Sequence, residues 1–225
     1  MRRLTAMAAT GVRLRNALRD HGRTLATSLG FARETGAALA DSLRLQYARW
    51  PRRYHDARHL LACVDAAESM RGRTECVDAV AFALWFHDAV YWPWRHDNER
   101  RSAEQARSSA LRLGLGPAFA DRVHALVMAT AHAAEPALPD DAALSWVLDI
   151  DLGILGAPPD VYDRYRRDVR REYFFVLPAA WRRGRAAVLR RFLAQPTIYR
   201  SACYRDRLEA LARSNLRREL SALEG

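Results

Sequence analysis

Apolar residues recur at helical spacing along most of the chain, and no stretch alternates apolar and polar residues over the length of a strand. Proline or glycine marks several of the breaks between apolar segments, as at Pro51, Gly114 and Pro158. We therefore predict an all-α protein. The pattern places helices at about 35–50, 57–72, 75–91, from 98 to a break at 114–117, from there to 132, and then at 144–155, 161–175, 179–193 and 204–223.

The N-terminal residues 1–24 hold arginines among small residues, with Asp20 as their only acid. We expect a variable or disordered basic extension there. The remaining residues, 25–225, are enough for one helical domain with a sizeable core. The chain has no run of about 18 or more apolar residues, so we expect a soluble protein without a membrane-spanning segment.

All 36 basic residues are arginine, and the net charge is +10 at pH 7. The absence of lysine excludes P-loop and Schiff-base chemistry, which both need its amine. The positive charge favours anionic ligands, and the guanidinium group suits phosphate, although a solvated basic surface explains the charge equally well. Three cysteines without a C-x-x-C spacing fit a reducing cytoplasm, and we assign them no role.

The most apolar predicted helix ends in two adjacent polar residues, His87 and Asp88. A buried carboxylate is costly unless a cation, a metal or a network of donors accompanies it. The pair therefore indicates a metal site, or else a hydrogen-bonded pair that caps the helix. Upstream, His55 and His59 are four residues apart, so on a helix they would share one face.

Four ordered motifs surround these residues: R-x-Y-H-x-x-x-H at 52–59, F-H-D-x-V-Y at 86–91, N-E-x-x-S-A at 98–103 and D-x-D-L-x-I-L-G at 149–156. The series resembles the HD-domain superfamily, and within it a bacterial subgroup of predicted metal-dependent phosphohydrolases. The similarity runs from about residue 25 to about residue 220. It implies an HD-domain-like helical bundle and a cytoplasmic enzyme that cleaves the phosphate ester of a small molecule or nucleotide.

The resemblance also implies roles for individual residues. It makes His59, His87, Asp88 and Asp151 the metal ligands, with Asp88 able to bridge a second ion and so to act in catalysis. The motif context favours Asp151 over Asp149; on a helix the two point about 200° apart, so both cannot easily face one metal. His55 would protonate the leaving oxygen, or alternatively orient His59 or a carboxylate.

Four further residues are candidates for a second metal or for substrate: Glu99, His132, Arg170 and Arg185. Glu99 also suits the first turn of a helix, and a lone histidine such as His132 is often satisfied by the backbone. Arg170 and Arg185 could each clamp a phosphate with two hydrogen bonds.

The expected cofactor is one or two divalent ions, and Fe, Mn, Ni, Co, Zn and Mg are not distinguished by the sequence. Two alternatives stay open. One is an HD-type diiron oxygenase, which the presence of Tyr91 in place of the last histidine of H-D-x-x-H disfavours. The other is a non-catalytic module, stabilised by metal, whose arginines bind nucleic acid or another partner. The sequence determines neither the substrate nor the oligomeric state.

Overall fold

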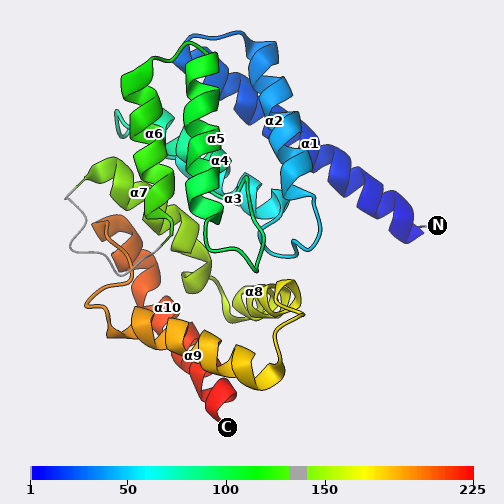
Figure 1. Cartoon of the computed structure of the whole chain (residues 1–225), viewed down its shortest axis with the longest axis vertical. Coiled ribbons are helices and arrows are strands. Elements are labelled where there is room, and N and C mark those ends of the chain that lie inside the picture. Colours follow the sequence, from blue (N-terminus) through cyan, green and yellow to red (C-terminus); the bar gives the residue numbers. More distant parts are fainter. Residues whose placement is uncertain (1, 132–140) are drawn as a thin grey trace. The chain divides into compact units, whose positions relative to one another are not determined.

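The computed structural model describes residues 2–131 and 141–225, with side chains from residue 10 onward. These residues form ten α-helices and one short 3-10 helix, and they contain no strand (Figure 1). The predicted all-α class is therefore confirmed. None of the described helices combines the length and apolar character that a membrane crossing requires. The chain divides into two compact units, residues 1–139 and 140–225.

The first unit is built around α4, whose side chains after Asp78 in the first turn are all apolar and nearly all buried. Helices α1, α3, α5 and α6 all pack against it. Such a helix has no polar face, so it has to be enclosed by its neighbours. The six helices are α1 (Arg2–Leu29), α2 (Arg33–Tyr47), α3 (Ala57–Glu68), α4 (Val77–Phe86), α5 (Asn98–Arg112) and α6 (Pro117–Ala129).

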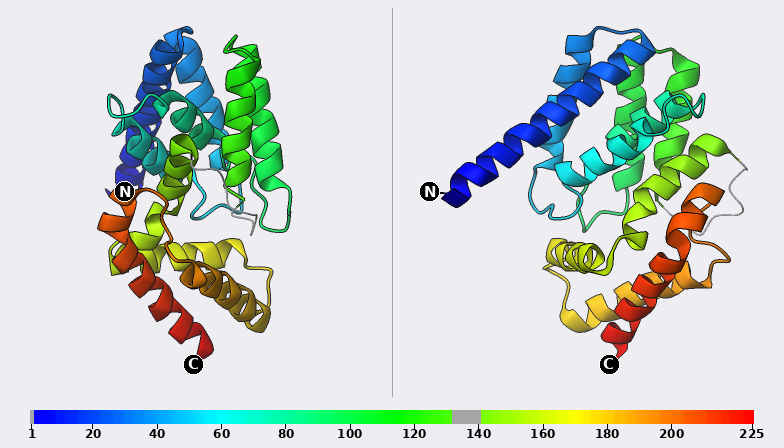
Figure 2. Two further views of the ribbon diagram at one scale, coloured as in Figure 1. Left: turned by 90° about the vertical axis from the view of Figure 1, so that its left-hand side faces the viewer. Right: turned by 180° about the vertical axis from the view of Figure 1, so that it is seen from behind.

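Residues 2–24, where we expect a variable or disordered extension, lie in the long helix α1. Figures 1 and 2 show α1 and α2 side by side near the short loop that joins them. Two glycines allow this contact: a Cβ on Gly22 would lie 2.4 Å from the carbonyl oxygen of Gly36. Leu18 and Leu25 of α1 are fully or almost fully buried. The helix is thus anchored by close backbone contact and by burial of its apolar side chains.

The second unit contains α7 (Ala142–Asp151), the 3-10 helix η1 (Leu152–Gly156), α8 (Pro159–Glu172), α9 (Pro178–Ala194) and α10 (Ala202–Glu224). It has an apolar core of its own, in which Tyr162, Phe192, Tyr199 and Leu216 are the principal side chains. The single domain predicted over residues 25–225 stays a prediction.

Candidate metal centre

Helix α4 ends at Phe86, five residues before the end predicted from its apolar pattern. In a continuing helix the backbone N–H of Asp88 would donate to the carbonyl of Leu84. Here that N–H donates to the hydroxyl of Tyr47 (3.1 Å), and the Leu84 carbonyl accepts instead from Nδ1 of His87 (2.8 Å). Two side chains thus replace one helical hydrogen bond, which ends the helix and leaves His87 and Asp88 in the turn that follows.

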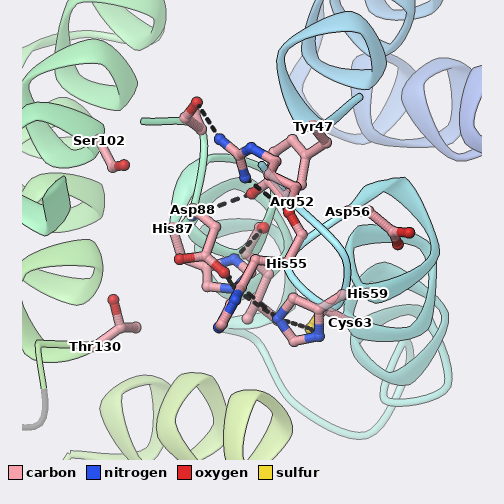
Figure 3. A network of polar contacts seen from close by, with 12 residues as sticks. Tyr47, Arg52, His55, Asp56, His59, Cys63, His87, Asp88, Ser102 and Thr130 are labelled. Carbon is pink, nitrogen blue, oxygen red and sulfur yellow. Dashed lines mark hydrogen bonds and ion pairs between the residues drawn. The ribbon is translucent and has the colours of Figure 1, made fainter. Parts of the chain in front are cut away.

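The contact with Leu84 also fixes the tautomer of His87. A carbonyl oxygen only accepts, so Nδ1 carries the proton and a neutral ring has its lone pair on Nε2. That Nε2 atom lies 3.0 Å from Nε2 of His59 and 3.2 Å from Oδ2 of Asp88. Both imidazoles are buried, and Figure 3 shows them with Asp88 in one cluster. Histidines that bind metal commonly donate their second ring nitrogen to a backbone carbonyl in this way.

The spacing of these atoms fits a metal ion. Two ligand atoms in neighbouring octahedral positions, each about 2.1 Å from the ion, lie about 3.0 Å apart. The observed separations are 3.0 Å between the two imidazole nitrogens and 3.2 Å from His87 to Asp88, while His59 and Asp88 are 3.7 Å apart. Three Lewis bases converge, and they repel one another unless a proton or a cation lies among them. The residues of the first unit therefore suit a divalent cation.

The electrostatics of Asp88 agree with this interpretation. Burial on its own raises the pKa of this carboxyl, but the opposing effects of His87, His55 and His59 are together larger. The net result holds the pKa of Asp88 well below its ordinary value. Asp88 is therefore an anion at neutral pH, as a metal ligand must be.

Cys63 is a site residue to which the sequence analysis gave no role. It is buried on α3, one helical turn after His59, and its Sγ lies 3.7 Å from Nε2 of His59 (Figure 3). Candidate ligand atoms of His59, Cys63 and His87 all lie within 4.8 Å of one another. The i, i+4 spacing of His59 and Cys63 was a signal that could have identified it.

His55 lies in the turn before α3 and not on the helix, because α3 begins only at Ala57. The helical face predicted for His55 and His59 is therefore wrong, yet the turn still brings their ring centroids to 5.9 Å. The imidazole of His55 stacks on Tyr91, with centroids 4.3 Å apart. Asp56 is the N-cap of α3 and accepts a hydrogen bond from the N–H of Arg58 (2.8 Å).

Arg52 joins the two segments that carry the histidines. Its guanidinium donates to the carbonyl of His55 (2.9 Å) and to the carbonyl of Ala89 (3.0 Å). It also lies over the rings of Tyr47 and Tyr91, at 4.8 and 5.3 Å from their centroids. The arginine of the first motif thus fixes the turn of His55 against the turn that contains Asp88.

Two residues of the N-E-x-x-S-A motif hold the loop that follows Asp88. Asn98 accepts from the N–H of Trp92 (3.1 Å) and donates to its carbonyl (2.9 Å). Ser102 does the same with Val90, at 3.0 and 3.2 Å. Glu99, between them, is half-buried in the first turn of α5. The motif acts here by positioning the loop.

The second unit separates the roles of the two candidate aspartates. Asp149 is fully buried, and its two carboxylate oxygens accept from the N–H groups of Arg200 and Ser201, each at 2.7 Å. Burial raises the pKa of Asp149, while these hydrogen bonds lower it to a smaller extent. Asp149 therefore anchors the segment before α10, whereas Asp151 is the last residue of α7 and is half-buried.

The remaining predicted residues are Arg170, Arg185 and His132. Arg170 donates to the carbonyls of Tyr173 (2.5 Å) and Val176 (2.9 Å), at the end of α8. The side chain of Arg185 is buried and forms a bidentate ion pair with Glu219. Its Nε lies 2.9 Å from Oε1 and its Nη2 lies 3.0 Å from Oε2. His132 lies outside the described residues. Both arginines thus have structural partners within the second unit.

Comparisons of the chain with protein-family models, with curated proteins and with solved structures found no match. The resemblance to HD-domain proteins therefore stays a prediction that rests on the four motifs, and the function has to be inferred from the chemistry of the site.

Proposed function

We propose that the protein is a metal-dependent phosphohydrolase that cleaves the phosphate ester of a small molecule or nucleotide. The observation that supports this most directly is the convergence of His59, His87 and Asp88, with their candidate ligand atoms separated by 3.0 to 3.7 Å. Asp151 is the fourth ligand that the motif series predicts. A bound divalent ion would supply a water of lowered pKa and would polarise a phosphoryl oxygen.

The residues around the ligands have separate tasks in this proposal. The Leu84 carbonyl keeps the Nε2 lone pair of His87 available, and Asp88 supplies negative charge. His55 is held by its stacking on Tyr91 and is the proposed acid, which would deliver a proton to the leaving oxygen. The arginine-rich surface would attract an anionic substrate.

The test begins with metal content. Elemental analysis of the purified protein is compared with that of His87→Ala and Asp88→Ala variants, and a screen for phosphate release follows with the identified metal. We expect close to one or two equivalents of metal in the wild-type protein, a large loss in both variants and phosphate release by the wild type alone. A wild-type protein that binds no divalent metal after reconstitution would refute the proposal.

Cys63→Ser separates two possible ligand sets. If Asp88 completes the set with the two histidines, this variant keeps its metal and its activity. If the thiolate of Cys63 is a ligand, the variant loses metal. In that case the wild-type protein should prefer zinc or iron, the metals that thiolate ligands favour. Activity measured without oxygen then distinguishes hydrolysis from the oxygenase alternative, because only the oxygenase consumes O₂.

A further inference from the structure

A cavity of about 330 Å³ lies within the second unit, between α8, α9 and α10. Its volume falls at the lower end of the range of about 300–1,000 Å³ that is usual for small-molecule sites. The principal lining residues are Arg166, Arg167, Arg170 and Arg171 of α8, Trp181 of α9 and Glu219 of α10. None of them is a proposed metal ligand, so the cavity can be considered apart from the metal centre.

Arginine is the most frequent residue in the lining of the cavity. Arg166 and Arg170, and likewise Arg167 and Arg171, are four residues apart on α8, so each pair follows one side of the helix. Like charges at this spacing destabilise a helix. The carboxylate of Glu219 does not offset them, because it already accepts two hydrogen bonds from Arg185.

The four arginines differ in the ion pairs and hydrogen bonds that they form. Arg166 pairs with Asp163 at 3.0 Å, and Arg171 pairs with Asp168 at 2.8 Å through a side chain that is 65% exposed. Arg167 is exposed and has no hydrogen-bond or ion-pair partner among residues 10–131 and 141–225. Arg167 and Arg171 can therefore bind an external anion without breaking a buried contact.

Trp181 adds a flat surface to this basic cavity. The guanidinium of Arg170 lies 5.2 Å from the centroid of the indole and is held there by its bonds to the carbonyls of Tyr173 and Val176. Arg170 beside the indole, with the exposed Arg167 and Arg171 on the same helix, combines charge with an aromatic surface. Planar rings stack on such side chains, and guanidinium groups bind phosphate oxygens in pairs.

We infer that this cavity binds the phosphate groups of a nucleotide-sized anion, with Arg167 and Arg171 on the phosphates and Trp181 against the planar ring. The site extends the phosphate contact predicted for Arg170 to a set of residues that the sequence motifs do not mark. It does not depend on the proposed hydrolysis, since the inference concerns binding without metal.

The test is calorimetric titration of the full-length protein with ADP in the presence of EDTA, so that no divalent metal takes part in binding. We expect saturable binding with a stoichiometry near one, weakened at least about tenfold in Arg167→Gln/Arg171→Gln. Arg164→Gln/Arg183→Gln is the matched control, because it removes the same charge from exposed arginines that do not line the cavity. The control should change the affinity less than about twofold, which is the scale of diffuse electrostatics at moderate salt.

Pyrophosphate, which has no ring, tests the role of the indole. Trp181→Leu should lower the affinity for ADP by a larger factor than the affinity for pyrophosphate. The inference is overturned if the wild type does not bind ADP saturably, or if the lining and control variants lose affinity equally. It is also overturned if the protein binds single-stranded DNA under these conditions but not ADP, because the arginines would then serve a nucleic-acid surface.

Discussion

The Nε2 atoms of His59 and His87 face each other at 3.0 Å, and the carbonyl of Leu84 keeps the proton of His87 on the other nitrogen. Without a metal, His59 therefore has to donate the proton of this contact. A divalent ion would displace that proton and take both lone pairs. The pair is preorganised for a cation, because its geometry is fixed by α3 on one side and by the end of α4 on the other.

The two histidines of the first motif should have different roles: His59 binds the metal and His55 donates the proton. His59→Ala should lose its metal, and its activity with it. His55→Gln should keep the metal and lower kcat by roughly 10²- to 10⁴-fold, the usual contribution of a general acid. Metal analysis of both proteins, together with steady-state kinetics of His55→Gln, checks this. Loss of metal from His55→Gln would show that His55 is a ligand.

Substitution of the two aspartates of α7 should have different effects, on stability at Asp149 and on metal content at Asp151. Asp149→Asn removes one of two acceptors for buried N–H groups, so the free energy of unfolding should fall by about 1–3 kcal/mol while metal content stays unchanged. Asp151→Asn should lose metal. Urea denaturation and elemental analysis of the two variants give the comparison. If Asp149→Asn is the variant that loses metal, the assignment of Asp151 is wrong.

The ion pair of Arg185 and Glu219 should contribute to the stability of the second unit. Arg185→Met leaves a buried carboxylate without its cation, which should lower the free energy of unfolding by about 3–5 kcal/mol. Glu224→Gln is the control, since it breaks an ion pair with Arg190 in which both side chains are about half exposed. That change should stay within about 1 kcal/mol. Equal effects in chemical denaturation would contradict a structural role for Arg185.

The crossing of α1 and α2 should not tolerate a methyl group. A Cβ on Gly36 would lie 2.1 Å from the carbonyl oxygen of Gly22, so Gly36→Ala should lower stability by about 1–3 kcal/mol. Gly184→Ala, within α9, meets no atom within 4 Å and should raise stability by about 0.5–1 kcal/mol. Thermal unfolding of the two proteins measures both. A neutral Gly36→Ala would mean that α1 does not pack against α2 in solution.

The sequence by itself determined the helical class and, to within about two residues, the first residue of each helix after α1, whereas it placed several helix ends two to five residues too late. Class and helix starts depend on residues within one or two helical turns of each other, so periodicity and proline are sufficient. The local pattern indicated only that His87 and Asp88, at the end of an apolar helix, form either a metal site or a cap. The resemblance of the motif series to HD-domain proteins added His59 to the same proposed site.

Only the tertiary structure decided how these residues are used. Tyr47 ends α4 from 41 positions away, and Asp149 meets Ser201 across 52 positions. Arg185 similarly meets Glu219, 34 positions along the chain, instead of a phosphate. Hydrogen bonds and ion pairs over such separations form only when helices pack, and the local pattern of apolar and polar residues does not specify which polar partners then meet.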